Sequence, residues 1–301
     1  MLTRWDILRM LASGLKTEFQ KGYAGVSPLY TELTTEISSN KASEDYGWLW
    51  DNPALKEWKD EKAPKALLEH GFSIVNKSWE ATIAVDRDAL DDDQYGQVKI
   101  RAMQLWTTSK RGYDKELTRV IEAWTTTLCY DNQNFFDTTH SEGLSGVQSN
   151  YSSSSYALAS DKLKLIISAM RQFKTDTWEL AGINPTHIMV PTALEWTAKE
   201  LLDPTFVSVT TDPSKASLKW LLKVIVNPYL TNNGANSAYY VMDMSWAVKP
   251  FIFQNRKPMT FVAMDKDTDR DVFMSKTLYY SAEARFAFGY GDWRFAYKAI
   301  G

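Results

Sequence analysis

The longest regular stretch of the sequence runs from Asp91 to Leu128 and reads DDDQYGQVKIRAMQLWTTSKRGYDKELTRVIEAWTTTL. Mostly apolar residues recur along it at steps of three and four, as on one face of an α-helix: Val98, Ala102, Leu105, Ser109, Tyr113, Leu117, Val120, Trp124 and Leu128. No proline lies between Pro64 and Pro185, and Gly112 costs a helix only about 1 kcal/mol relative to alanine. About 30 helical residues would span roughly 45 Å, more than is usual in a globular domain. The stretch therefore predicts a long spine helix over about 91–128.

The chain before this helix begins with an amphipathic segment. Apolar residues that include Leu8, Leu11 and Leu15 recur at three- and four-residue steps, so a helix is predicted over residues 3–20. Two interpretations remain open for this helix: it packs on its own domain, or it belongs to an arm that reaches a neighbouring molecule.

A long excursion follows, with no clean helical or strand period over residues 44–72. It carries three tryptophans and a charged tip, namely Trp48, Trp50, Trp58 and Asp60-Glu61-Lys62. A long loop of this kind in a compact domain is usually functional or binds a partner. Short strands are predicted after it, at 73–75 and 81–85.

The second half of the chain alternates predicted helices and strands, which is typical of an α+β fold. After a loop at 131–160, the pattern predicts helices at 163–173 and 193–202, and strands at 187–190, 220–226, 238–242 and 246–253. At the end, two runs of alternating aromatic residues consist of Phe286, Phe288 and Tyr290, then Trp293, Phe295 and Tyr297. With Gly291-Asp292 between them, these runs predict an aromatic β-hairpin at 286–297.

The composition excludes several classes of protein. The 301 residues include 34 Lys and Arg against 37 Asp and Glu, a net charge of −3, whereas a dedicated nucleic-acid binder is normally strongly basic. One cysteine excludes an intramolecular disulfide and a cysteine-built zinc site, and three histidines leave little for a histidine-built one. Twelve tryptophans, 15 tyrosines and 13 phenylalanines instead supply large apolar areas for a core or an interface.

The sequence contains neither an export signal nor a membrane-spanning stretch. Arg4 and Asp6 interrupt the apolar run that a signal peptide needs, and no later segment has the roughly 18 apolar residues of a membrane helix. We therefore expect the chain to be made in a cytoplasm and to have no membrane partner.

No catalytic, cofactor or metal site is predicted. The acidic run at 265–271 has Arg270 and Lys276 where a calcium loop needs Gly and Glu, and the carboxylates at 86–93 suit the start of a helix. Gly289-Tyr290-Gly291 lacks the third glycine of a dinucleotide site. Cys129 follows an apolar helix face, where cysteine is more often a small buried hydrophobe than a nucleophile paired with a base such as His140.

Several stretches become informative when they are taken together and in order. They are Tyr46-Gly47-Trp48-Leu49, Val85-Asp86-Arg87-Asp88, Asp92-Asp93-Gln94-Tyr95-Gly96, Leu128-Cys129-Tyr130-Asp131, Asn134-Phe135-Phe136-Asp137, Lys249-Pro250-Phe251-Ile252-Phe253-Gln254, Asp271-Val272-Phe273-Met274, Ala284-Arg285 and Gly289-Tyr290-Gly291-Asp292-Trp293. In this order and spacing they resemble the Mu-like phage major head subunit family, the gpT proteins, over nearly the whole chain.

The resemblance implies the α+β Hong Kong 97-type phage capsid fold. Its parts are an N-terminal arm, an extended loop (E-loop), a peripheral domain with a long spine helix, and an axial domain that faces the capsomer centre. The expected boundaries are 1–43 for the N-terminal helix and arm, 44–80 for the E-loop, 81–160 for the peripheral domain with its spine helix, 161–248 for the axial domain and 249–301 for a return to the peripheral domain.

The resemblance also implies the function of a major capsid protein of a tailed bacteriophage or prophage. Copies would assemble in the bacterial host cytoplasm into pentamers and hexamers of an icosahedral shell that encloses double-stranded DNA without sequence-specific binding. Expected partners are the protein itself, a scaffold or maturation protease, a portal and a decoration protein. No propeptide precedes the arm, so the scaffold is expected to be a separate protein.

Contacts between subunits are expected from the arm and the E-loop, because aromatic anchors suit interface centres and charged groups suit their rims. The expected interface residues are Trp48, Trp50, Trp58, Asp60, Glu61, Lys62, Leu8, Leu11 and Leu15. Two alternative functions remain: the shell of an encapsulin-like nanocompartment, and a soluble cytoplasmic α/β enzyme.

Overall fold

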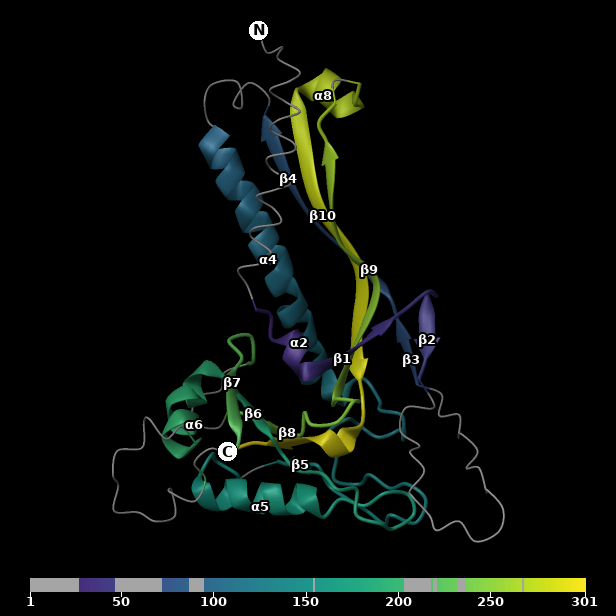
Figure 1. Cartoon of the computed structure of the whole chain (residues 1–301), viewed down its shortest axis with the longest axis vertical. Coiled ribbons are helices and arrows are strands. Elements are labelled where there is room, and N and C mark those ends of the chain that lie inside the picture. The colour runs from purple at the N-terminus through teal and green to yellow at the C-terminus, as the bar shows by residue number, and fades with distance from the viewer. Residues whose placement is uncertain are drawn as a thin grey trace.

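The computed structural model describes residues 27–46, 72–86, 95–153, 155–202, 218, 221–231, 237–266 and 268–301. Figure 1 shows an elongated upper part, made of long strands beside one long helix, above a broader lower part. Helix α5 crosses the base of the lower part, and the chain ends in the same part. None of the helices among the described residues is long and apolar enough to span a membrane.

The long helix of the upper part is α4 (Tyr95–Glu122), which continues into a 3₁₀ turn at Ala123–Thr125. Its 28 residues correspond to about 42 Å, so the long predicted helix is confirmed. It ends before Leu128, because Thr125, Thr126 and Thr127 are β-branched residues with low helix propensity. Leu128 instead forms a β-bridge with Asn134.

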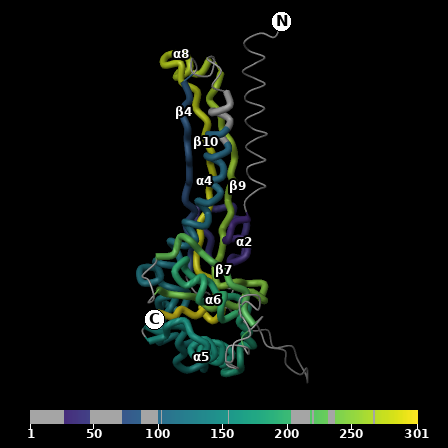
Figure 2. Tube along the Cα trace, turned by 90° about the vertical axis from the view of Figure 1, so that its left-hand side faces the viewer, coloured from purple at the N-terminus to yellow at the C-terminus, as the bar shows by residue number. Residues whose placement is uncertain are grey.

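A four-stranded sheet with the order β1-β9-β10-β4 lies beside α4 (Figures 1 and 2). Its strands are β1 (Thr34–Ser38), which follows the short helix α2 (Tyr30–Leu33), β4 (Lys77–Asp86), β9 (Phe251–Met264) and β10 (Thr277–Tyr290). Strand β1 is parallel to β9, and the other two pairs are antiparallel. The helix packs on this sheet through Tyr113, whose ring stacks on Phe286 with a centroid distance of 4.3 Å.

A five-stranded sheet with the order β5-β11-β8-β6-β7 forms the lower part. Its strands are β5 (Tyr151–Ser152), β6 (His187–Val190), β7 (Lys223–Val226), β8 (Tyr239–Met242) and β11 (Ala296–Ala299). The helices of this part are α5 (Ser160–Arg171) and α6 (Glu195–Leu202), the latter after a 3₁₀ turn at Thr192–Leu194. The helices predicted at 163–173 and 193–202 and the strands predicted at 187–190, 220–226 and 238–242 are therefore confirmed in type, with β7 starting at residue 223 rather than 220. Strand β5 lies within residues 131–160, which were predicted to be a loop.

The predicted aromatic hairpin at 286–297 is wrong. Strand β10 ends at Tyr290 in the upper sheet, a 3₁₀ turn follows at Trp293–Phe295, and β11 pairs with β8 in the lower sheet. Gly291 donates its N–H to the Pro250 carbonyl oxygen at 2.7 Å, and a Cβ there would lie 2.3 Å from the Lys249 carbonyl oxygen. This close approach requires glycine and carries the chain from one sheet to the other.

The strand predicted at 246–253 also needs correction. Strand β9 starts only at Phe251 and continues to Met264, and it pairs with β10 along most of its length. The helix α8 (Arg270–Ser275) connects the two strands at their far end. The period-2 pattern weakens after residue 254, because the outer half of β9 is only partly buried.

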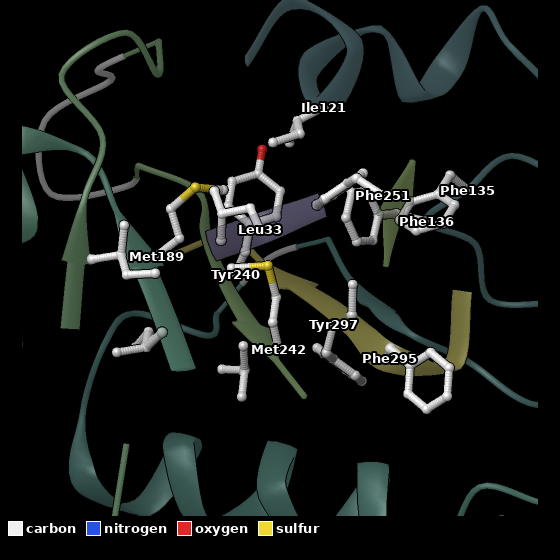
Figure 3. Close-up of a cluster of buried hydrophobic side chains, with 14 of the residues drawn as sticks. Leu33, Ile121, Phe135, Phe136, Met189, Tyr240, Met242, Phe251, Phe295 and Tyr297 are labelled. Atoms are coloured by element: carbon white, nitrogen blue, oxygen red, sulfur yellow. The ribbon is translucent and has the colours of Figure 1, made fainter. Parts of the chain in front are cut away.

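One core joins the two parts. Figure 3 shows buried side chains from the long helix, both sheets and the loop after α4 meeting in a single cluster. The labelled members are Leu33, Ile121, Phe135, Phe136, Met189, Tyr240, Met242, Phe251, Phe295 and Tyr297. Much of the aromatic content of the sequence is therefore placed where the two sheets meet.

Candidate assembly surfaces

The two ends of the predicted excursion are joined in the structure. Strand β2 (Ser43–Asp45) pairs antiparallel with β3 (Ser73–Val75). The Tyr46 N–H donates to the Phe72 carbonyl oxygen at 2.9 Å, and the Asn76 N–H donates to the Ala42 carbonyl oxygen at 2.9 Å. Residues 47–71 therefore leave and re-enter the fold at one place.

This two-stranded base is fixed to the upper sheet. The Tyr46 hydroxyl donates to Gln254 Oε1 at 2.6 Å, and Gln254 Nε2 donates to the Ile74 carbonyl oxygen at 3.1 Å. All three residues are buried. Ile74 also covers Gly289, where a Cβ would lie 2.3 Å from its Cδ1 atom. The base of the excursion is thus a rigid attachment point.

The interface residues predicted from the sequence lie outside the described residues and remain predictions. They are Trp48, Trp50, Trp58, Asp60, Glu61, Lys62, Leu8, Leu11 and Leu15. The helix predicted over 3–20 and the acidic residues at 87–93 also lie outside the described part of the chain.

Cys129 and His140 do not form a nucleophile–base pair. Cys129 is buried, and burial raises the pKa of its thiol well above the usual value. The His140 ring has other partners: Nδ1 lies 2.5 Å from Asp131 Oδ2, and Nε2 lies 3.2 Å from Asn150 Oδ1. Over the ranges that the structure describes, no three His, Cys, Asp or Glu residues are grouped as metal ligands.

A buried ion network was not predicted from the sequence. Arg294 donates from Nε and Nη2 to the carboxylate of Asp292, at 2.7–3.0 Å, and its Nη1 lies 3.4 Å from Glu142 Oε2. Burial raises the pKa of Glu142, although Arg294 opposes that shift. The sequence signal that could have indicated it is Asp292-Trp293-Arg294, a pair of opposite charges within an aromatic run. The network ties the loop after α4 to the crossing between the sheets.

Asn150 is the hydrogen-bonding centre of the same region. Its fully buried Nδ2 lies within 2.9–3.2 Å of three carbonyl oxygens, those of Phe135, Trp293 and Ala296. Its Oδ1 accepts from the Asp137 N–H at 2.9 Å. One side chain therefore joins backbone groups of the loop after α4 to backbone groups near the C-terminus.

Lys298 lies in an unusual setting on β11. Its Nζ lies 4.1 Å from the centre of the Trp124 ring, and it lines a pocket of about 210 Å³ together with Glu122 and Tyr240. Burial lowers the pKa of Lys298 to about 8. Among the described residues, no carboxylate forms an ion pair with it.

A turn at residues 174–180 exposes an unusual tryptophan. Trp178 has φ +69°, a conformation that bulky residues rarely adopt, and its side chain is 56% exposed. Lys174 Nζ lies 3.1 Å from the ring centre, and the ring lies over Gly146 of the neighbouring loop. The remaining exposed apolar side chains of these two loops are Leu144, Val147 and Leu180. Exposed aromatic groups on strained turns are typical of contact surfaces.

A second apolar surface lies at the far end of the upper part. Phe273 and Met274 on α8 are 78% and 72% exposed. Val272, next to them, is buried with Leu278 and Tyr280. This contact holds α8 in place while Phe273 and Met274 face outward. Both surfaces are candidates for contacts with other molecules.

Comparison with known proteins identifies one family. The model of the Mu-like prophage major head subunit gpT matches residues 8–157, 141–230 and 231–300. The chain is 26% identical to the Mu-like prophage FluMu major head subunit of Haemophilus influenzae, over 98% of this chain and 74% of that protein. It is 24% identical to the major capsid protein of Escherichia phage Mu, over 98% of this chain and 73% of that protein.

Solved capsid structures have a similar fold. The procapsid of bacteriophage JBD30 matches with a TM-score of 0.62 and 23% identity, covering 98% of this chain and 75% of that one. The capsid of the native GTA particle matches with a TM-score of 0.55 and 13% identity, covering 90% and 89%. The chain therefore has the mixed α+β fold of phage and GTA capsid structures.

Proposed function

Since the chain belongs to the Mu-like prophage major head subunit gpT family, whose members are structural capsid proteins and not enzymes, we propose that its copies close into the pentamers and hexamers of an icosahedral phage head. Its place is the virion capsid, where it forms the shell. Family membership decides against the two alternatives considered from the sequence, an encapsulin-like compartment and a soluble α/β enzyme.

The architecture suggests how each part contributes to a Hong Kong 97-type subunit. The upper sheet with α4 corresponds to the peripheral domain and its spine helix, and the lower sheet with α5 and α6 corresponds to the axial domain. Residues 1–43 would form the arm and 44–80 the E-loop. Because β11 pairs with both β8 and β5, the axial domain would include residues 151–152 and 296–299 in addition to 161–248.

The observation that supports an E-loop most directly is the pairing of β2 with β3. A segment whose ends are hydrogen-bonded together can extend toward a neighbour without disturbing the fold that holds it. Heterologous contacts of this kind close into rings when the rotation between copies is constant. We assign Trp48, Trp50 and Trp58 to the centre of that contact, Asp60, Glu61 and Lys62 to its rim, and Leu8, Leu11 and Leu15 to the arm.

Further partners follow from the role of a head subunit. A shell of this kind would enclose double-stranded DNA without sequence-specific binding and would meet a portal and a scaffold or maturation protease during assembly. A decoration protein is a further candidate partner, since the JBD30 capsid is decorated with minor capsid protein trimers. The net charge of −3 suits a wall that encloses DNA without binding it tightly.

Deletion of residues 52–66 tests this proposal. The hydrogen bonds of β2 with β3 would remain, and residues 47–51 and 67–71 would still connect them. We expect a subunit with an unchanged melting temperature that forms no shells, measured by sedimentation and electron microscopy beside the full chain. Shells of normal size from the deleted chain would contradict the E-loop assignment, and a full chain that never forms shells under any assembly condition would contradict the function.

A further inference from the structure

Three basic residues are gathered at an irregular point of the upper sheet. Between Glu283 and Phe286 of β10, the register with β9 shifts twice, so that β9 contains extra residues around Pro258 and Arg256. Arg285 lies directly opposite Lys257, and Arg256 occupies the adjacent bulge. In a bulge, two residues of one strand oppose one residue of the other. Arg256 and Lys257 therefore both oppose Arg285.

The basic group lies on the face of the sheet that is turned away from α4. Phe286, next to Arg285 in β10, stacks on Tyr113 of α4, so Arg285 points to the opposite face because side chains alternate along a strand. Lys257 shares that face, since directly opposed residues in an antiparallel pair point the same way.

This arrangement is unfavourable in the isolated subunit. Like charges directly opposite each other destabilise a sheet pair. Two buried nitrogen atoms, Arg256 Nη1 and Arg285 Nε, have no hydrogen-bond partner within the described part of the chain. A buried charged donor without a partner costs more than a neutral one. On the same face, the described strands carry Glu283, whose carboxylate is 3.7 Å from Lys257 Nζ, and Glu80, which lies opposite Glu283.

We propose that Arg256, Lys257 and Arg285 form a binding site for a carboxylate group from a neighbouring copy of this chain in the assembled shell. The inference rests on the proposed shell function, which brings copies into contact. A carboxylate accepts paired N–H donors from a guanidinium, and Arg256 and Arg285 are both partly exposed. A carboxylate bound to their exposed N–H groups would compensate the charge of two side chains that each have one buried nitrogen atom without a partner in the isolated subunit.

A carboxylate fits this site better than the phosphate backbone of DNA. Glu80 and Glu283 lie opposite each other, two residues along the strands from Arg285, and the Glu283 carboxylate is 3.7 Å from Lys257 Nζ. A continuous line of phosphates would be repelled by these glutamates, whereas one carboxylate can contact the basic group alone. The chain itself carries 37 Asp and Glu residues, so a neighbouring copy can provide the acidic partner.

The test uses the double variant Arg256→Gln/Arg285→Gln and a matched control, Arg101→Gln/Arg111→Gln, which removes the same charge from exposed positions of α4. We expect the first variant to lose at least tenfold in shell yield by sedimentation, while the melting temperature of its unassembled subunit stays equal or rises. The control should keep its shell yield. A charge-conserving Arg256→Lys/Arg285→Lys variant should recover part of the loss.

A ligand titration tests carboxylate binding at this site independently of assembly. Citrate should raise the melting temperature of the unassembled wild-type subunit and of the control, but not that of the Arg256→Gln/Arg285→Gln variant. Three results would overturn the proposal: an equal citrate response in the wild type and the Arg256→Gln/Arg285→Gln variant, normal shells from that variant, or a lower melting temperature of its subunit than that of the wild type. A stronger response to duplex DNA than to citrate would overturn it in favour of a phosphate site. Failure of the wild type to form shells would count against the shell function and leave the citrate result to decide the site.

Discussion

Replacing Asn150 by aspartate should destabilise the subunit strongly, although the two side chains have nearly the same shape. Asn150 Nδ2 donates toward the carbonyl oxygens of Phe135, Trp293 and Ala296, and the residue is fully buried. An ionised aspartate has no N–H group, so it would place an acceptor oxygen against three other acceptors.

The magnitude follows from two lost hydrogen bonds, because the amide Nδ2 carries only two N–H groups and the Trp293 carbonyl oxygen also accepts from the Ala296 N–H. Each buried carbonyl group that loses its donor costs about 1–3 kcal/mol, so Asn150→Asp should reduce the free energy of unfolding by at least about 2 kcal/mol. A whole domain is stable by only about 5–15 kcal/mol. The variant should therefore accumulate poorly, and its unassembled subunit should unfold at a clearly lower urea concentration.

Asn184→Asp is the matched control. Asn184 is exposed, and its Oδ1 accepts from Arg171 Nη2 at 2.7 Å and Nε at 3.2 Å. Aspartate keeps that acceptor and adds a charge that favours the bond, so stability should be unchanged or slightly higher. Urea unfolding, followed by tryptophan fluorescence, measures both variants. If Asn150→Asp and Asn184→Asp differ by less than about 1 kcal/mol, the hydrogen-bond reasoning is wrong.

Three further predictions concern other positions. Lys298→Met should raise the free energy of unfolding at pH 7 by about 1–3 kcal/mol. The pKa of Lys298 is lowered from 10.5 to about 8, and each pKa unit corresponds to about 1.36 kcal/mol of destabilisation of the charged form, part of which the contact with the Trp124 ring offsets. Because the unfolded chain binds that proton more tightly, wild-type stability should rise from pH 8 to 10.5; parallel pH profiles of wild type and variant in urea unfolding would contradict this. Trp178→Gly should change the free energy of unfolding of the subunit by less than about 1 kcal/mol, because relief of the positive φ offsets the lost cation–π contact and the added entropy of the unfolded chain. The same variant should lower the shell yield. Normal sedimentation of its shells would exclude Trp178 from the interface. Phe273→Ser/Met274→Ser should likewise lower shell yield with an unchanged subunit melting temperature, and a lower melting temperature would show that these side chains serve the fold.

Local patterns predicted much of the secondary structure. The long helix, the strand at 187–190 and the helix before residue 173 are confirmed because each depends on the spacing of apolar residues within one element. The hairpin at 286–297 is wrong for a related reason. Alternation of aromatic residues predicts a strand and its buried face, but it does not predict which strand lies beside it.

Some of the candidate site residues were predicted from the sequence, and others were found only in the structure. The nine expected interface residues came from an aromatic and charged excursion and from the arm, and the structure supports only the closed base that holds that excursion. Arg256, Lys257 and Arg285 showed no sequence signal. The first two adjoin Pro258 in β9, but the bulge that places them opposite Arg285 exists only when β9 and β10 are paired.

The sequence by itself determined the type of most elements, the absence of a recognisable catalytic motif, and the family, because these depend on periodicity, composition and ordered motifs along the chain. The tertiary structure alone decided which strands pair, where the chain crosses between sheets, and which charges are buried. Asn150 and Trp293 show the physical reason: 143 residues separate them, yet one hydrogen bond joins them in the folded subunit. Contacts over such distances are set by the packing of the whole chain, and no local pattern records them.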